Sequence, residues 1–279
     1  MGGLLSMMSA PPPPPPRPPP PRPPQPAVGR FVYPPPITDY ADLPAMLGHP
    51  DLGPLIMGWF VDDTAAASAL RGTCVAARDA VAACAWADAT TRIVWLGRWR
   101  RAFPRAVTAS VHGNTRLSDA DFVHLRGLHV LDMGECNPAN ITDAAFAHLA
   151  GIHTLDMSGC NQATITDGAF AHLRGIHALS MSGCNQRTIT DGAFAHLAGI
   201  HTLNMSYCRQ TTITDAAFGH LAGIHTLDMS GCNQWTITDG AFAHLAGIDT
   251  LDMSGCNQAT ITASCRERLR QAGIAALTI

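Results

Sequence analysis

The sequence HTLDMSGCNQATITD at residues 153–167 returns almost unchanged as HTLDMSGCNQWTITD at residues 225–239. Its cysteine belongs to a series spaced 24 residues apart, which is Cys136, Cys160, Cys184, Cys208, Cys232 and Cys256. A fixed period of about 20–50 residues is typical of solenoids. We therefore predict six good copies of a 24-residue unit over residues 121–264, with a truncated copy at residues 269–279.

Each unit combines two periodicities. Residues 154–158 alternate polar and apolar side chains, which predicts a short strand with Leu155 and Met157 facing inward. Apolar residues also recur at every third position, as a helical turn requires, at Phe146, Leu149 and Ile152. Thr166 offers an N-cap oxygen for the helical turn of the next unit. Because one unit cannot bury its apolar face alone, we expect the strands to stack as a parallel sheet, about 4.8 Å apart.

A degraded copy precedes the six good ones and lacks the cysteine. We expect three of its residues to stand opposite Leu131, Met133 and Cys136 of the next copy, and they are Val107, Ala109 and His112. Histidines recur at two positions in almost every unit, one before the helical leucine and one before the strand. Repetition at structural positions predicts packing or a solvated column, so we expect neither a catalytic histidine nor a metal site.

The repeated cysteines are predicted to form a buried column of free thiols beneath the loops. Free cysteine packs as a small hydrophobe and is among the most buried residue types. Disulfides or a metal column are the alternatives, but side chains that point the same way on parallel neighbours reach disulfide torsions with difficulty. The sequence contains no CxxC pair. Structural thiols indicate a reducing compartment, and we expect a cytoplasmic or nuclear protein.

The string LxxIxxLxMxxC at residues 149–160 resembles the leucine-rich repeat. With ITD at residues 165–167, the unit is similar to the cysteine-containing subtype of F-box/leucine-rich-repeat proteins. The resemblance recurs six times and covers a little over half of the chain. It implies an α/β solenoid with a parallel sheet. The 24-residue length implies a shortened return segment, which affects the expected curvature and leaves the fold class unchanged.

The segment ADLPAMLGHPDLGPLIMGWFVDDTAAASALRGTCVAARDAV at residues 41–81 resembles an F-box. By this resemblance a Skp1-type protein would bind through Leu43, Pro44, Leu55, Ile56 and Leu70. Two departures weaken the match, because Ala77 replaces the usual tryptophan and prolines interrupt the first helical region. A plain helical cap for the solenoid is the alternative. Asp63, just before Thr64, is expected to start the second helix.

The chain is thus predicted to have three parts: a disordered Pro-rich tail at residues 1–37, an F-box-like helical domain at 38–96 and the solenoid at 97–279. The tail holds a proline tract at residues 11–26 that should be extended. The chain contains no lysine, which fits a GC-rich genome. Near-identical repeats on that background are similar to the F-box/repeat families of giant DNA viruses, which implies the host cell as the location.

Composition narrows the function classes. The net charge is −3, and residues 121–264 hold 12 acidic residues against 4 arginines, which argues against nucleic acid as a partner. No apolar run reaches the length of a membrane span, about 18 residues. The sequence has no catalytic triad order and no Gly-rich phosphate loop after a strand. We therefore expect no enzyme activity and no cofactor.

Two sets of residues are candidates for binding a protein partner. The outward face of the strands carries an acidic column, at Asp132, Asp156, Asp228 and Asp252. This column predicts a groove for a basic partner, with a solvated polar face as the alternative. The second set departs from the repeat along one loop edge, at Arg187, Tyr207, Arg209 and Trp235. The resulting hypothesis is a substrate-recognition adaptor of an SCF-type ubiquitin ligase, and the alternative is an interaction scaffold that does not bind a Skp1-type protein.

Overall fold

The computed structural model of the chain describes residues 57–58, 63–73 and 75–279. The chain divides into two compact units, residues 1–40 and 41–279, and every described residue belongs to the second unit. The predicted Pro-rich tail therefore lies outside the described residues. None of the described helices is long and apolar enough to cross a lipid bilayer.

The second unit contains a parallel sheet whose eight strands follow one another in chain order. The strands are β1 (Thr108–Ser110), β2 (Val130–Asp132), β3 (Thr154–Asp156), β4 (Ala178–Ser180), β5 (Thr202–Asn204), β6 (Thr226–Asp228), β7 (Thr250–Asp252) and β8 (Ala276–Thr278). Leu155 pairs with Leu131 on one side and Leu179 on the other, so equivalent positions of successive repeats lie side by side. The predicted α/β leucine-rich-repeat solenoid is confirmed.

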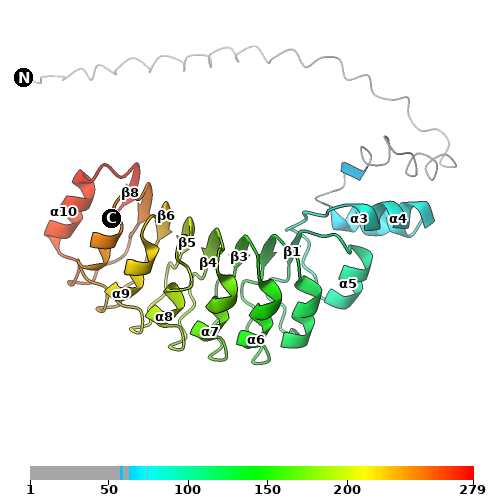
Figure 1. Ribbon diagram of the computed structural model, residues 1–279, viewed down its shortest axis with the longest axis horizontal. Coiled ribbons are helices and arrows are strands. Elements are labelled where there is room, and N and C mark those ends of the chain that lie inside the picture. Colours follow the sequence, from blue (N-terminus) through cyan, green and yellow to red (C-terminus); the bar gives the residue numbers. More distant parts are fainter. Residues whose placement is uncertain (1–56, 59–62, 74) are drawn as a thin grey trace, which may run out of the picture. The chain divides into compact units, whose positions relative to one another are not determined.

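Short helical segments return the chain from each strand to the next and line the opposite side of the arc from the sheet (Figure 1). They are η2 (Asp119–Leu125), α6 (Asp143–Phe146), η3 (Ala147–Leu149), α7 (Asp167–Phe170), η4 (Ala171–Leu173), α8 (Asp191–Phe194), α9 (Asp215–Phe218), η5 (Gly219–Leu221), η6 (Ala241–His244) and α10 (Ala263–Gln271). The predicted cap is confirmed, since the Thr166 hydroxyl accepts a hydrogen bond from the Gly168 amide.

The same threonine also links neighbouring repeats. Its amide donates to Asp143 Oδ1 at 2.7 Å, and its hydroxyl donates to Asp143 Oδ2 at 2.5 Å. The pair recurs along the whole array, for example where Thr214 donates both bonds to Asp191 at 2.7 Å. The aspartate therefore begins its own helix and at the same time holds the start of the next one.

The core is a continuous column of shells, one from each repeat. Leu155, Met157, Cys160, Ile165 and Phe170 are all completely buried, and their equivalents in the other repeats are buried as well. The prediction that Leu155 and Met157 face inward is confirmed. Because each shell contacts only its neighbours, the stability of the array is close to a sum of repeat and interface contributions.

Within residues 63–102, the helices before the sheet are α3 (Thr64–Arg71), α4 (Val75–Ala83) and α5 (Leu96–Ala102). Asp63 caps α3 as predicted, accepting a hydrogen bond from the Ala66 amide at 2.8 Å. Helix α5 is fixed on the first repeat, where Arg100 Nε donates to the His124 carbonyl at 2.7 Å. Arg92, between α4 and α5, forms a parallel bridge with Ser110 of β1 at this edge of the sheet. The domain boundary expected between residues 96 and 97 stays a prediction.

The alignment of the degraded copy was wrong by two residues. In the structure Ala109, and not Val107, pairs with Leu131. Asn114 takes the place of Cys136, because its amide donates to the Val111 carbonyl as the Cys136 amide donates to that of Met133. Asn114 is buried, and its Nδ2 donates to the Ile93 carbonyl at 3.2 Å. The unit is 22 residues long here, so a constant period of 24 misplaced His112.

Candidate partner-binding surface

The acidic column on the strands has a structural role in the turns. Asp156 Oδ1 accepts a hydrogen bond from the Ser158 amide at 2.8 Å, which closes the turn after β3. The same bond, from the amide two residues after the aspartate, is made at 2.8 to 2.9 Å to Asp132, Asp228 and Asp252. All four side chains are half-buried. One carboxylate oxygen of each aspartate is therefore used by its own turn, and only the other oxygen can bind a partner.

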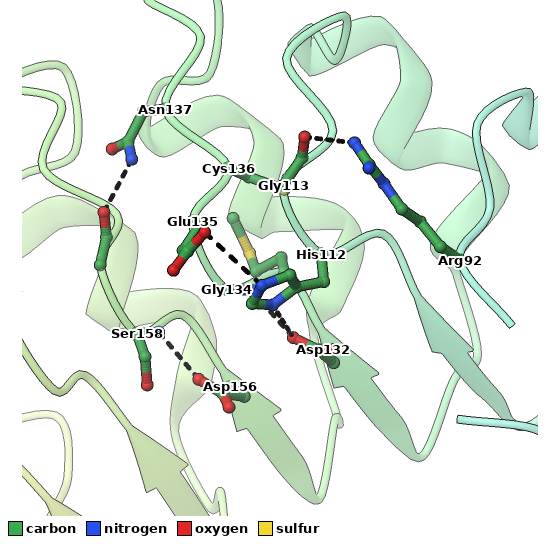
Figure 2. A network of polar contacts seen from close by, with 12 residues as sticks. Arg92, His112, Gly113, Asp132, Gly134, Glu135, Cys136, Asn137, Asp156 and Ser158 are labelled. Atoms are coloured by element: carbon green, nitrogen blue, oxygen red, sulfur yellow. Dashed lines mark hydrogen bonds and ion pairs between the residues drawn. The ribbon is translucent and has the colours of Figure 1, made fainter. Parts of the chain in front are cut away.

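The first aspartate of the column belongs to a local polar network (Figure 2). His112 Nδ1 lies 3.4 Å from Asp132 Oδ1, and His112 Nε2 lies 3.7 Å from Glu135 Oε2. The Ser110 hydroxyl donates to the other oxygen of Asp132 at 2.8 Å. A Cβ on Gly134 would lie 2.8 Å from the His112 ring, which explains the glycine where later repeats have serine. The Asp132 carboxylate at this end of the acidic face is thus in contact with side chains of the chain itself.

Tyr207 has an unusual backbone. Its φ is +56°, in the left-handed region, and the equivalent residues in neighbouring repeats, such as Gly183 and Gly231, are glycines with φ of +66°. This conformation costs a residue with a side chain about 1–2 kcal/mol. The side chain is 55% exposed, so it gains little from burial. Tyr207 is therefore a strained residue that holds an aromatic ring at the surface.

Arg209 interrupts a ladder of asparagines beside this tyrosine. In other repeats the asparagine side chain accepts a hydrogen bond from the next repeat, as Asn161 Oδ1 does from the Asn185 amide at 2.6 Å. An arginine has no acceptor, so residue 209 cannot offer this bond to Asn233. The Arg209 guanidinium carbon lies 6.0 Å from the centroid of the Tyr207 ring. The structure thus brings these two candidates together.

Trp235 is the most exposed large apolar residue among the described ones, at 69%. It stands at a loop position where other repeats have Ala163, Arg187 or Ala259. Arg187 is exposed as well. Within the described residues, neither Trp235 nor Arg187 makes a ring contact or ion pair with Tyr207 or Arg209. The four candidates are accessible, and their role in binding stays a prediction.

The candidate contacts for a Skp1-type protein fall mostly outside the described residues, since Leu43, Pro44, Leu55 and Ile56 belong to the undescribed part. Leu70 is described. It lies on α3 and is partly buried against the core. Ala77, which stands where the F-box pattern has a tryptophan, is completely buried on α4.

The cysteine column has the predicted form, with buried free thiols. Cys184 Sγ donates to the Met157 carbonyl at 3.1 Å, so each thiol ties the loop of the preceding repeat. Burial raises the pKa of Cys136 and Cys256 to about 11 and the pKa of Cys184 and Cys232 to about 12. These thiols are protonated at neutral pH and are poor nucleophiles.

The histidines before the strands form a stacked column, as their repetition at one position predicted. The rings of His129, His153, His177, His201 and His225 stack with centroids 4.1 to 4.5 Å apart. Asp249 takes the next position, and its Oδ2 lies 2.7 Å from His225 Nδ1. Desolvation and then the neighbouring rings lower the pKa of His153 and of His201. The signal was the recurrence of histidine one residue before each strand.

In the part of the chain that the structure describes, no group of three or more His, Cys, Asp or Glu side chains could hold a metal ion. The exposed features described above are an aromatic and basic patch on the loop edge and a polar sheet face.

No model of a known protein family matches the chain, and no curated protein matches it in sequence. Among solved structures, the chain is similar to one in a TLR13–ssRNA13 complex, with a TM-score of 0.48 and 23% identity over 57% of this chain and 23% of that one. It is also similar to chains in the Drosophila Toll–Spatzle complex. The first has a TM-score of 0.36 and 14% identity over 61% of this chain and 29% of that one. The glycosylated form has a TM-score of 0.41 and 14% identity over 56% and 27%. This chain thus spans less than a third of the length of each.

Proposed function

We propose that the chain is a non-catalytic protein-binding module whose partner contacts the loop edge at Tyr207, Arg209 and Trp235, a surface called here the aromatic edge. Tyrosine, tryptophan and arginine are the residues that most often dominate binding energy in protein interfaces. The near-identical repeats make these departures stand out, because each one replaces a small or polar residue that the fold accepts elsewhere.

The strained backbone of Tyr207 carries the proposal. A glycine at this position would remove the strain, and four neighbouring repeats have glycine there, at Gly159, Gly183, Gly231 and Gly255. Strained residues persist where the surrounding structure enforces them, and they gather at binding and catalytic sites. Glu135 has the same φ of +56° at the equivalent position of an earlier repeat, but Tyr207 adds an aromatic ring that is 55% exposed, and this combination supports contact with a partner.

The experiment uses the neighbouring repeats as a guide to the variants. The triple variant Tyr207→Gly, Arg209→Asn and Trp235→Ala restores the common residue at each position and should fold at least as well as the wild type. Proteins enriched from a cell extract by the wild-type chain should be lost from the triple variant. A control with Arg174→Ala, on the helical side of the array, should retain them. Equal enrichment by the wild type and the triple variant would reject the aromatic edge as the binding surface.

The finer form of the proposal is a substrate-recognition adaptor of an SCF-type ubiquitin ligase, acting in the cytoplasm or nucleus. It is supported by the F-box resemblance of residues 41–81 and by the presence of α3 and α4 in that segment. The adaptor would bring the target close to the catalytic subunits and so raise its effective concentration. The alternative is a scaffold whose helices only cap the solenoid, which the buried Ala77 favours.

Binding of the full chain to a purified Skp1-type protein separates the two forms. The adaptor predicts binding that Leu55→Asp or Ile56→Asp abolishes, while a Trp235→Ala control leaves it unchanged. The scaffold predicts no binding by any of these proteins. Circular dichroism of each variant shows whether the substituted chain is folded.

A further inference from the structure

We infer that the surface around Trp95 is a second binding site, which takes a short acidic peptide segment of a partner protein. The site lies where α5 meets the first repeat. Two adjoining cavities, of about 220 and 330 Å³, share Val94, Trp95 and Arg98 in their walls. Concave sites of this size between structural elements are common places for ligand binding.

Three arginines line the smaller cavity: Arg98, Arg101 and Arg116. All three are exposed, and the side chains of Arg98 and Arg101 make no hydrogen bond or ion pair with another described residue. The guanidinium carbon of Arg116 lies 5.3 Å from the centroid of the Trp95 ring. The cavity is also lined by Asp121, but its Oδ2 accepts hydrogen bonds from the Ser118 amide and hydroxyl at 2.9 and 2.8 Å. The site is therefore positively charged.

Other arginines in this region have a structural role instead. Arg92 donates to the Gly113 carbonyl at 2.5 Å, Arg100 to that of His124 at 2.7 Å, and Arg105 to that of Ala83 at 2.9 Å. Arg98, Arg101 and Arg116, whose side chains donate no such bond, line the smaller cavity. In the wall of the larger cavity, the buried Nε of Arg71 also lacks a hydrogen-bond partner among the described residues. Arg71 and Arg98 thus line the larger cavity, and Arg98, Arg101 and Arg116 line the smaller one.

The chemistry of the walls indicates the ligand. Guanidinium groups bind carboxylates with two parallel hydrogen bonds. Between the arginines, Val94 is 43% exposed and Trp95 is 58% exposed, which offers an apolar surface for a ligand side chain. A long polyanion such as a nucleic acid would continue over the repeats, where 12 acidic residues against 4 arginines repel it. A short segment that combines carboxylates with an apolar residue fits both features.

Fluorescence anisotropy of the intact chain tests this site with defined probes. The probes are a fluorescein-labelled peptide EEDLLEDE and its neutral twin QQNLLQNQ. We expect the acidic peptide to bind at least tenfold more tightly than the twin, roughly the effect of one charge-assisted pair. The double variant Arg98→Gln and Arg101→Gln should weaken the acidic peptide by a similar factor. The matched control, Arg174→Gln and Arg270→Gln, carries the same change of net charge on two exposed arginines away from the cavity and should bind it normally.

Three results would overturn the assignment. The first is no binding of the acidic peptide, or equal binding of its neutral twin. The second is an equal loss in the matched control, which would mean that only the net charge matters. The third is competition, in which oligo(dT) or inorganic phosphate displaces the peptide as effectively as unlabelled EEDLLEDE. That would make the site one for nucleic acid or for small anions. Thermal unfolding of both double variants shows that each remains folded, so a loss of binding reports on the site.

Discussion

The ring of Tyr207 lies directly over Gly231 of the next repeat, where an added Cβ would meet its Cδ1 and Cε1 atoms at 2.7 Å. Gly183 has the same φ of +66° and no atom within 4 Å of such a Cβ, which makes it a matched control. We predict that Gly183→Ala costs about 1–2 kcal/mol of unfolding free energy from the left-handed backbone alone. Gly231→Ala should cost about 0.5–1.5 kcal/mol more, because the ring must leave its rotamer.

A double-mutant cycle isolates the contact between the two residues. In a Tyr207→Gly background the excess cost of Gly231→Ala should vanish, and urea unfolding would measure it. An excess cost that persists without the tyrosine ring would show that the ring does not cause it.

Replacing the strained tyrosine should stabilise the fold. Tyr207→Gly removes about 1–2 kcal/mol of left-handed strain, and the greater freedom of glycine in the unfolded chain offsets part of that gain. We therefore expect a net increase of up to about 1 kcal/mol in unfolding free energy, measured by urea denaturation, together with weaker partner binding. Tyr207→Ala keeps the strain and loses the ring, so it should give no such increase. A destabilised Tyr207→Gly protein would mean that the ring supports the fold.

Neighbouring repeats are linked by the aspartate that begins each helical segment, which accepts two hydrogen bonds from the threonine of the next repeat. Asp191→Ala leaves the Thr214 amide and hydroxyl without their acceptor, and the loss of a partly buried pair should cost about 1–3 kcal/mol. Asp191→Asn retains a carbonyl oxygen for the amide and should cost less. Chemical denaturation of the two variants measures the difference. Equal values for both substitutions would show that the negative charge, and not the hydrogen-bond geometry, holds the repeats together.

The buried cysteine column makes the fold less stable at alkaline pH. A thiol in the unfolded chain has a pKa of about 8.5, whereas burial raises the pKa of Cys184 to about 12 in the folded chain. Above about pH 8.5 the folded state therefore binds more protons than the unfolded state, and stability falls as pH rises. Each such thiol lowers the unfolding free energy by about 1.4 kcal/mol per pH unit up to its folded pKa.

Urea midpoints at several pH values above 8.5 measure this slope. Cys184→Ala lowers stability at every pH because it removes a buried side chain. It should also make the fall of unfolding free energy with pH less steep, by the contribution of one thiol. A slope that does not change in Cys184→Ala would contradict the assignment of the alkaline loss to the column.

The sequence predicted the repeating features well because their signals are local and recur. The strand alternation, the Thr166 cap and the buried thiols each depend on a pattern within one unit. The degraded copy was misaligned because its unit is shorter, and the true register is shown by the pairing of Ala109 with Leu131 and by the hydrogen bond from Asn114 to the Val111 carbonyl. Regular spacing was the wrong assumption at the end of the array.

The candidate sites were predicted less completely, because they depend on contacts between repeats. Comparison of the repeats identified Tyr207 and Trp235 as departures, but the left-handed backbone of Tyr207 and its contact with Gly231 could be seen only in the structure. The two adjoining cavities at Trp95 are lined by Arg71, Arg98 and Arg116 from separate elements, and no motif connects them. The aspartates of the strands were predicted as partner contacts without their role in the turns.

The most direct test of the aromatic edge is a phage-displayed random-peptide library panned against the intact chain. Clones are then titrated against the wild type, the triple variant Tyr207→Gly, Arg209→Asn and Trp235→Ala, and an Arg174→Ala control. The account predicts clones whose affinity falls at least about tenfold in the triple variant, as loss of an interface hot spot would cause, and stays unchanged in the control. A library that yields no clones, or clones that bind the triple variant as tightly as the wild type, would contradict it.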